Sequence, residues 1–223
     1  MGTSNWQNIS YNIELVRKLN PYSILDIGVG FGRWGILFRE FLEIWEDGRY
    51  DGNWQRKIDG VEIYSGYIKD YHKYFYDNIY VCDALEFLEN TKERYDLINM
   101  GDVVEHLEKS EGEKMIELAM NKGKYVLINI PVGRYWNQEG TDENPCEAHR
   151  SIWYNNDFTK YKHHKIKCFR DHQHRDFSVI LLSSDKIKFS YRYGRYFGLK
   201  NFLKHRLHLK QLVEFYEKRK KKN

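Results

Sequence analysis

Apolar positions recur along the chain at two spacings, one typical of helices and one of short buried strands. Residues 5–20 form the first helical stretch, whose apolar positions are Ile9, Ile13, Val16 and Leu19. Asn20 and Pro21 interrupt this pattern and predict the end of the helix. Downstream, the pattern predicts a first strand that begins at Ser23 and four more strands at residues 57–64, 78–83, 95–100 and 124–130. It predicts helices between them at residues 34–41, 65–75 and 110–121.

This alternation of strands and helices predicts an α/β fold, because consecutive βαβ units form a parallel sheet with its ligands at the carboxyl ends of the strands. After the fifth strand the pattern changes to a long loop at residues 131–156, a short helix from Asp157, and two strands at residues 165–170 and 177–183. We expect one Rossmann-like three-layer sandwich domain over residues 1–223, whose mostly parallel seven-stranded sheet ends in an antiparallel hairpin. Its other parts are an N-terminal cap helix within residues 1–22, an active-site loop at 131–156 and an amphipathic helix at 195–219.

The first predicted strand runs into a glycine-rich turn, DIGVGFG at residues 26–32. Glycines in such a turn let the backbone approach a ligand at the N-terminus of the following helix. A nicotinamide-dinucleotide fingerprint requires a further glycine where this chain has Arg33, so the spacing excludes that class of cofactor. The next strand carries Glu62 near its carboxyl end, where a carboxylate can accept hydrogen bonds from ribose hydroxyls.

The sequence DIGVGFG resembles motif I of the class I S-adenosylmethionine-dependent methyltransferases. This resemblance implies that the glycines hold the methionine part of S-adenosylmethionine and that Asp26 positions it. It also implies that Asp83 meets the adenine amino group and that Ala84 or Leu85 lines the ring. The expected cofactor-binding residues are Asp26, Gly28, Gly30, Gly32, Glu62, Asp83 and Ala84.

A second candidate group, Asp102, Glu105 and His106, follows the fourth predicted strand. If a helix begins at or just before Asp102, its three side chains share one face, which is ligand geometry. With His149 in the long loop, the pattern resembles in part the magnesium-dependent enzymes that methylate the 2′-hydroxyl of small RNA 3′ ends, and also ubiquinone-pathway O-methyltransferases. The resemblance implies that Asp102, Glu105, His106 and His149 bind Mg²⁺ or Mn²⁺. Without a metal, His106 would act as a general base oriented by Glu105, and the expected catalytic residues are Asp102, Glu105 and His106.

The acceptor is indicated by the stretch NPCEAHRSIWYNNDF, residues 144–158, which resembles methyltransferases of bacterial and viral glycan assembly. That resemblance implies O-methylation of a saccharide hydroxyl. Four aromatic side chains in or beside the loop can either stack on a sugar ring or pack the loop down: Tyr135, Trp136, Trp153 and Tyr154. The alternatives are an RNA 2′-O-methyltransferase, a small-molecule O- or N-methyltransferase, and a non-catalytic protein that binds S-adenosylmethionine.

Composition narrows the class of protein further. Hydrophobic content of 41% and charged content of 30% are globular values, and no apolar run approaches the roughly 20 residues of a membrane span. The first ten residues show no secretory pattern. The three cysteines, Cys82, Cys146 and Cys168, are widely spaced, and an odd number argues against a disulfide framework, so we expect a cytoplasmic protein. The net charge of +4 owes much to residues 218–222, which disfavours a nucleic-acid partner. A monomer and a homodimer are both compatible with the sequence.

Overall fold

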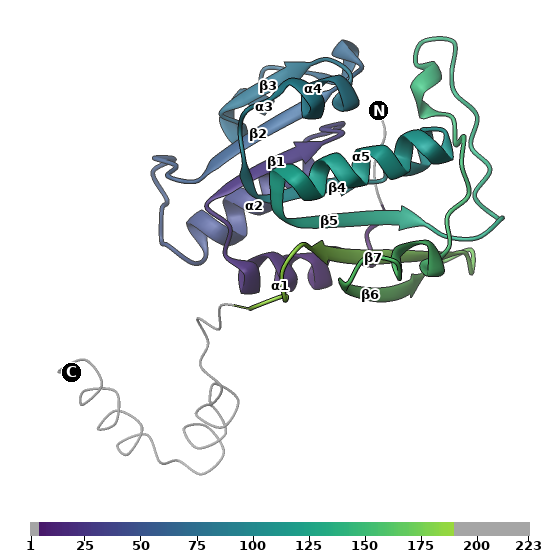
Figure 1. Cartoon of the computed structure of the whole chain (residues 1–223). Coiled ribbons are helices and arrows are strands. Elements are labelled where there is room, and N and C mark those ends of the chain that lie inside the picture. The colour runs from purple at the N-terminus through teal and green to yellow at the C-terminus, as the bar shows by residue number, and fades with distance from the viewer. Residues whose placement is uncertain (1–4, 190–223) are drawn as a thin grey trace. The chain divides into compact units, whose positions relative to one another are not determined.

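Figure 1 shows the computed structural model, which describes residues 5–189. Up to Lys188 the chain forms one compact unit. The helix predicted at residues 195–219 lies outside the described residues, and the single-domain organisation of the whole chain stays a prediction.

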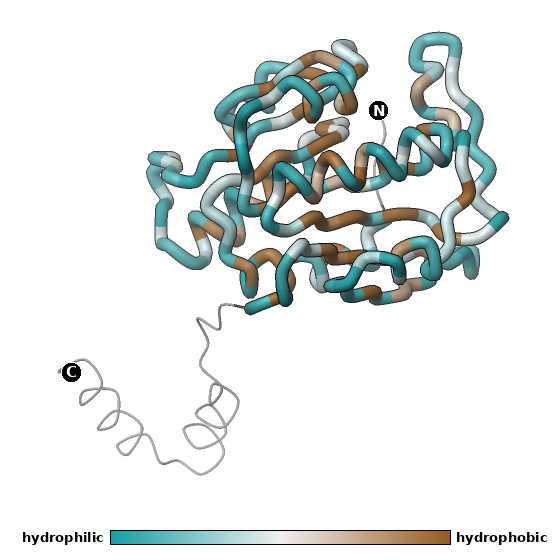
Figure 2. The backbone as a smooth tube through the Cα atoms, viewed as in Figure 1, coloured by the Kyte–Doolittle hydropathy of each residue, from teal (hydrophilic) through white to brown (hydrophobic). Residues whose placement is uncertain are grey.

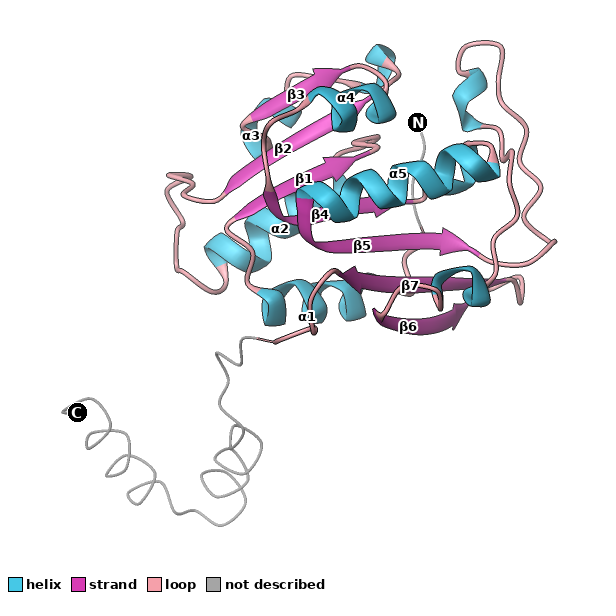
Figure 3. Ribbon diagram, viewed as in Figure 1, coloured by secondary structure: helices cyan, strands magenta, loops and turns pink. Residues whose placement is uncertain are grey.

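A seven-stranded sheet forms the middle layer of the fold (Figure 3). Its strand order is β3-β2-β1-β4-β5-β7-β6; the strands from β1 to β5 run parallel, and β7 is antiparallel to both β5 and β6. The strands are β1 (Ser23–Ile27), β2 (Lys57–Glu62), β3 (Asn78–Val81), β4 (Tyr95–Gly101), β5 (Gly123–Pro131), β6 (His163–Arg170) and β7 (Asp176–Ser183). This arrangement confirms the predicted α/β fold class, including the antiparallel hairpin at the end of the sheet.

Helices cover both faces of the sheet (Figure 1). They are α1 (Ile9–Leu19), α2 (Arg33–Phe38), α3 (His72–Phe75), α4 (Ala84–Asn90) and α5 (Lys109–Lys122), and α2 continues into a π-helix, Arg39–Ile44. Shorter 3₁₀ turns occupy Ser65–Tyr67, Val104–His106, Pro145–Glu147 and Asn155–Phe158. Within residues 5–189, no helix combines the length and the apolar character needed to cross a membrane.

The two faces of β4 show how the layers are held together. Ile98 and Met100 belong to the apolar core that also contains Met115 and Ile116 of α5. Asn99 lies between them in the strand, so its side chain points to the opposite face of the sheet. There its Nδ2 donates to Asp26 Oδ1 at 2.8 Å. Figure 2 shows the apolar segments that run along the central strands. Burial on both faces explains why these strands read as nearly continuous apolar runs in the sequence.

Two helical segments differ from the sequence-based expectation. The helix expected over residues 65–75 is divided, because Ile68 has extended backbone angles (φ −76°, ψ 125°) between the 3₁₀ turn and α3. The short helix α4 was not expected, and Asp83 begins it as an N-cap, accepting hydrogen bonds at Oδ1 from the backbone N–H groups of Leu85 (2.8 Å) and Glu86 (3.1 Å). Both segments lie between β2 and β4, on the side of the sheet where ribose and adenine were expected.

The parallel register brings the carboxyl ends of the central strands to one edge. Ile27 at the end of β1 pairs with Met100 of β4 and with Val61 of β2, and Glu62 pairs with Val81 of β3. Residues that directly follow these strands are therefore neighbours in space although they are far apart in the chain. This edge is where the sequence predicted a ligand site.

Candidate functional site

A cavity of about 610 Å³ opens at this edge of the sheet. Its lining includes residues at or just after the carboxyl ends of the central parallel strands, among them Gly28, Glu62, Asp83 and Asp102. Two further segments contribute, the long loop after β5 and the turn between β6 and β7. The cavity thus has a cofactor end, beside the glycine turn, and an acceptor end, beside the loop.

The glycine turn has the backbone geometry that its sequence predicted. Gly28, Gly30 and Gly32 have φ values of 78°, 50° and 83°, a region that side chains with a Cβ rarely adopt. A Cβ on Gly28 would lie 2.5 Å from Val103 Cγ2. Gly28 and Gly30 line the cavity, whereas Gly32 is buried and does not. Two of the three glycines therefore present their backbone to the cavity, and the third lies within the turn.

Glu62 is fixed beside this turn by two backbone donors. Its Oε2 accepts from Gly30 N–H at 2.9 Å and its Oε1 accepts from Tyr64 N–H at 2.9 Å. Burial raises the pKa of the Glu62 carboxyl, against the opposing effect of these hydrogen bonds. The carboxyl reaches the cavity wall, in a position compatible with the ribose role predicted for it.

Asp83, Ala84 and Leu85 also line the cavity, where the resemblance places the adenine ring. The carboxylate of Asp83 is engaged through Oδ1 as the cap of α4. An N-cap holds the side chain in one orientation, because it satisfies backbone donors at the start of the helix. The sequence identified the position of Asp83 but not this second, structural role.

Asp26 does not reach the cavity. Its side chain is fully buried under the glycine turn, where Tyr76 donates its hydroxyl to Oδ2 at 2.6 Å and Asn99 donates to Oδ1 at 2.8 Å. Burial raises the pKa of Asp26 to about 7, more than its two hydrogen bonds lower it. In this structure Asp26 joins β1, β4 and the residue after α3, so any effect on a cofactor acts through the turn above it.

The backbone after β4 differs from the helix assumed in the sequence analysis. Asp102 has φ 54°, in the left-handed region, and a 3₁₀ turn, Val104–His106, follows. The helical turn starts only at Val104, and left-handed Asp102 lies outside it, so the shared-face premise for Asp102 is wrong. Asp102 nevertheless lines the cavity, and its charge acts on both Arg33 and Glu105.

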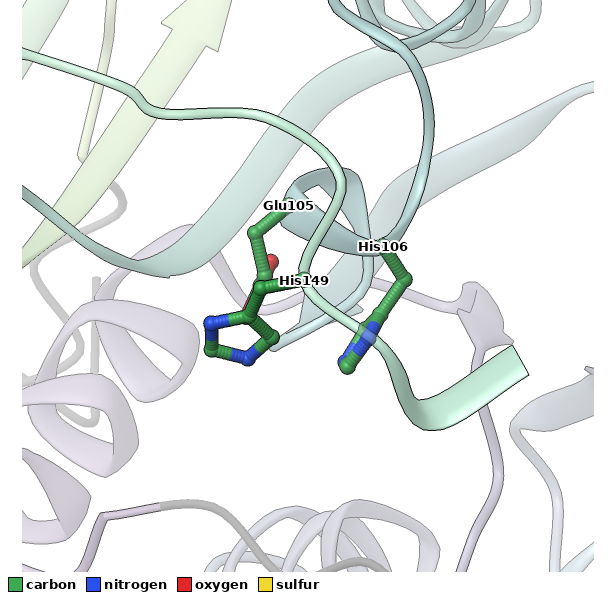
Figure 4. Close-up of side chains that lie close together, drawn as sticks. All are labelled: Glu105, His106 and His149. Carbon is green, nitrogen blue, oxygen red and sulfur yellow. The ribbon is translucent and has the colours of Figure 1, made fainter. Parts of the chain in front are cut away.

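Three of the four expected metal-site residues come together at the acceptor end (Figure 4). Ligand atoms of Glu105, His106 and His149 all lie within 4.8 Å of one another, and the two imidazole centroids are 4.9 Å apart. Within the described part of the chain, Asp102 is not a member of this cluster. Glu105 and His106 come from the 3₁₀ turn and His149 comes from the loop, so the cluster depends on how the loop is attached.

Backbone hydrogen bonds attach the loop to the 3₁₀ turn. The carbonyl oxygen of Glu105 accepts from the N–H groups of Arg150 at 2.9 Å and Ser151 at 3.1 Å. His149, the residue before this pair, is thereby brought to the side of Glu105 and His106. The loop histidine is positioned by the same turn that carries the other two side chains.

Both histidines are oriented through their Nδ1 atoms. Nδ1 of His106 lies 3.1 Å from the carbonyl oxygen of Ala148, and Nδ1 of His149 lies 2.7 Å from that of Trp136. A carbonyl oxygen only accepts, so Nδ1 carries the proton and Nε2 keeps its lone pair. Burial lowers the pKa of His106 and of His149, which favours the neutral imidazole that binds metals.

The carboxyl of Glu105 fits a cation-binding role. It is 1% exposed, and neither carboxyl oxygen has a hydrogen-bond partner among the described residues. Burial, and next the charge of Asp102, raise its pKa well above the usual range. A buried carboxyl without partners is costly, and a divalent ion would supply the missing interaction. Together with two neutral imidazoles it forms a mixed donor set suited to Mn²⁺, Fe²⁺ or Zn²⁺ as well as Mg²⁺.

The aromatic residues of the loop divide into two groups. Trp153 is 1% exposed and packs against Phe158 with Lys109 Nζ 3.6 Å from its ring centroid, so it holds the loop down. Tyr135 and Tyr154 are exposed and lie outside the cavity lining. Of the four rings, Trp136 alone lines the cavity.

Sequence reasoning missed other residues of the cavity wall. Asn5 and Trp6, which precede α1, line it together with Phe31 and Arg33. Arg33 donates from Nη1 to the carbonyl oxygen of Asn5 at 3.3 Å, which links the N-terminal segment to the glycine turn. Arg33 was visible in the sequence as the residue that breaks the dinucleotide fingerprint. Trp6 had no such signal, because it stands outside any motif.

Solved structures of similar fold include methyltransferases. A SAM-dependent methyltransferase from Archaeoglobus fulgidus superimposes with a TM-score of 0.57 at 18% identity, over 79% of this chain and 91% of that one. A putative O-methyltransferase from Klebsiella pneumoniae gives 0.54 at 14% identity, over 82% of both chains. The N-terminal domain of EvdMO1, solved in the presence of SAH and D-fucose, gives 0.52 at 12% identity, over 82% of this chain and 85% of that one. No protein-family model and no curated protein sequence matches the chain. At these identities the likeness establishes the fold, the Rossmann-like α/β architecture that these methyltransferases share.

Proposed function

We propose that this protein is an S-adenosylmethionine-dependent O-methyltransferase whose acceptor is a saccharide hydroxyl, assisted by a divalent ion. The observation that carries the proposal is one cavity with two ends. The glycine turn with Glu62 lies at one end, and the cluster of Glu105, His106 and His149 lies at the other. A transferase needs both a cofactor site and an acceptor site, with a shared space between them.

At the cofactor end, the chain offers the groups that an adenosyl ligand requires. The backbone of Gly28 and Gly30 would allow close approach of the ligand, the Glu62 carboxyl would accept from the ribose hydroxyls, and Asp83, which starts α4, would lie beside the adenine. When bound, S-adenosylmethionine supplies an electrophilic methyl group on a sulfonium. Of the similar structures, EvdMO1 was solved in the presence of SAH, the product of such a transfer.

At the acceptor end, the protein has to align a hydroxyl and remove its proton. Glu105, His106 and His149 would hold a Mg²⁺ or Mn²⁺ ion, which as a Lewis acid lowers the pKa of a bound hydroxyl. The protein side chains provide two Nε2 lone pairs fixed by backbone carbonyls and a carboxyl that lacks other partners. Without the ion, the same Nε2 of His106 is placed to accept the hydroxyl proton.

A saccharide acceptor is supported by the aromatic side chains around the cavity. Trp136, Trp6 and Phe31 line it, and aromatic faces stack on the C–H faces of sugar rings. EvdMO1, which shares the fold, was solved in the presence of D-fucose. Cytoplasmic location and a monomeric or homodimeric state stay predictions from the sequence.

The test is S-adenosylmethionine turnover, measured as S-adenosylhomocysteine released, against a glycan panel and an RNA duplex, each with and without a chelator. We expect turnover on a glycan that the chelator removes and Mn²⁺ or Mg²⁺ restores. Turnover that is indifferent to chelation would leave His106 as a base without a metal. Turnover on RNA alone would contradict the saccharide acceptor, and S-adenosylhomocysteine that fails to bind in calorimetry would contradict the methyltransferase itself.

A further inference from the structure

The acceptor end of the cavity has a basic side that the proposed reaction does not use. Arg150 of the loop lines it, together with His172 and Arg175 of the turn between β6 and β7. These residues come from two segments that are separate in the sequence. Basic side chains from both segments that line the same cavity are candidates to bind an anionic group of a ligand.

Arg150 is placed beside the cluster by its own backbone. Its N–H donates to the carbonyl oxygen of Glu105 at 2.9 Å, and it directly follows His149. Its side chain is exposed, and within residues 5–189 its guanidinium forms neither a hydrogen bond nor an ion pair. Glu147, which precedes Arg150 in the loop, accepts hydrogen bonds from the Tyr67 hydroxyl and from Gln138 Nε2.

Arg175 is held in a fixed orientation on the same wall. The Asp171 carboxylate, which is buried, accepts from Nε at 2.9 Å and lies 2.8 Å from Nη2. The guanidinium carbon lies 4.0 Å from the ring centroid of Trp136. Asp171 also accepts from the N–H groups of Gln173 and Arg175, at 2.9 Å and 2.8 Å, which stiffens the turn.

Trp136 connects Arg175 to the cluster. Its indole N–H donates to the carbonyl oxygen of Asp176 at 2.7 Å, and its own carbonyl oxygen accepts from His149 Nδ1 at 2.7 Å. Arg150, the residue after His149, and Arg175, which lies over Trp136, therefore both line the cavity that holds the cluster.

We propose that the acceptor is a saccharide that carries an oxyanion, a carboxylate or a phosphate, bound by Arg150 with Arg175 beside it. The proposal rests on the proposed function and names its substrate class more closely. A guanidinium offers a planar fork of donors that matches both oxyanions, and a planar aromatic wall at Trp136 suits the sugar ring. Arg150 needs no rearrangement of existing ion pairs to bind such a group.

The test is calorimetry on the full chain saturated with S-adenosylhomocysteine, with a chelator present so that no metal can bind the oxyanion. The probes are glucuronate, glucose 6-phosphate, glucose and inorganic phosphate. We expect the two charged sugars to bind more tightly than glucose, and Arg150→Met to weaken them by about tenfold or more, as for the loss of a charged hydrogen bond. Arg134→Met is the matched control, because Arg134 lies in the same loop, outside the cavity lining, and donates to Tyr154.

Each outcome decides the matter. Retained binding of S-adenosylhomocysteine by Arg150→Met shows that the variant is folded, so its weaker sugar binding supports the proposal. Glucose that binds as tightly as glucuronate, or equal losses in Arg150→Met and Arg134→Met, would overturn it. Binding of inorganic phosphate with no binding of either charged sugar would overturn the saccharide part. Failure of the wild-type chain to bind S-adenosylhomocysteine would instead contradict the proposed function.

Discussion

At the scale of single residues, Asp26 couples the fold to pH. Burial moves the pKa of its carboxyl from 3.8 to about 7. Between these values the native protein holds a proton that the unfolded chain has lost, so the free energy of unfolding falls as pH rises from about 4 to about 7, by at most about 4 kcal/mol. Asp26→Asn should lose this slope, because an amide does not titrate.

The amide that this substitution introduces has partners in place. Its oxygen can accept from the Tyr76 hydroxyl, and after the Asn99 amide turns over, its NH₂ group can donate to Asn99 Oδ1, which has no hydrogen-bond partner among residues 5–189 of the wild type. Urea unfolding at about pH 5 and about pH 8 measures the slope for both proteins. Glu62 and Glu105 also have raised pKa values, so the difference between the two slopes, and not the wild-type slope alone, reports Asp26. Equal slopes in the two proteins would show that Asp26 does not titrate in this range.

Gly30 tests the cofactor end. Gly30→Val should abolish binding of S-adenosylhomocysteine, because Gly30 lines the cavity and a side chain would occupy the ligand's approach. Valine is also strained at the φ of 50° that this position requires. Gly48→Val is a matched control: its φ is 72°, and a Cβ there meets nothing within 4 Å. If calorimetry finds equal affinity for S-adenosylhomocysteine in Gly30→Val and wild type, the assignment of the glycine turn to the cofactor site is wrong.

His106 tests the acceptor end. His106→Ala should keep its affinity for S-adenosylhomocysteine and lose turnover by at least about a hundredfold, since it removes the Nε2 that holds the ion or accepts the proton. His163→Ala, at the start of β6 and outside the cavity lining, should change neither quantity. Wild-type turnover in His106→Ala would show that the cluster is not the acceptor site.

At the scale of elements, the loop after β5 depends on a small number of attachments. Lys109 of α5 donates to the carbonyl oxygen of Ile152 at 3.1 Å, forms an ion pair with Asp157, and lies over Trp153. Lys109→Met should loosen the loop and raise KM for the acceptor several-fold, without changing the affinity for S-adenosylhomocysteine. The cation–π contact with a buried ring contributes about 1–2 kcal/mol of the lost anchoring.

Hydrogen exchange over residues 131–156 measures this loosening. Lys160→Met is the control, because its ion pair with Glu113, at 2.8 Å, is exposed and its ammonium lies over Tyr161, not over Trp153. Faster exchange is expected in Lys109→Met and not in Lys160→Met. Unchanged exchange in Lys109→Met would mean that the backbone bonds to Glu105 hold the loop without it.

The sequence predicted the strands well and the connections less well, for a physical reason. Strands buried on both faces are recognisable as apolar runs, whatever surrounds them. Alternation along β1 shows that Asp26 and Ile27 face opposite ways, but it does not show which face meets the ligand. The left-handed residue Asp102 and the extended residue Ile68 are themselves neither glycine nor proline, and the only signals of a break are the neighbouring glycines, Gly101 and Gly66.

Side-chain roles in the loop were predicted only in part. The pairing of Glu105 and His106 with His149 came from a resemblance and coincides with the cluster in the structure. Whether a tryptophan lines the cavity or packs the loop down depends on tertiary contacts: Trp136 lines the cavity, whereas Trp153 is buried under the loop. The contribution of Trp6 and Asn5 arises from where α1 is anchored, through Asn8 and Asn12 to Asn129 of β5, which no local pattern encodes.

At the scale of the whole molecule, a metal that binds only the native protein should stabilise it. The cluster joins the turn after β4 to the loop after β5, and neither segment alone supplies all three ligands. At about one hundred times its Kd, an ion adds about 2.7 kcal/mol to the free energy of unfolding. For a chain of 223 residues each kcal/mol corresponds to about 2–4 °C in Tm.

The variants that lose this stabilisation identify the side chains that bind the metal. Mn²⁺ should raise the Tm of the wild-type protein, and a chelator should reverse the rise. Glu105→Gln should abolish the shift, because its neutral amide is a much weaker ligand in a buried site. Asp102→Asn should keep most of it, since Asp102 lies outside the cluster. A shift that disappears in Asp102→Asn would restore the four-residue site expected from the sequence, while one that survives in Glu105→Gln would place the ion elsewhere in the molecule.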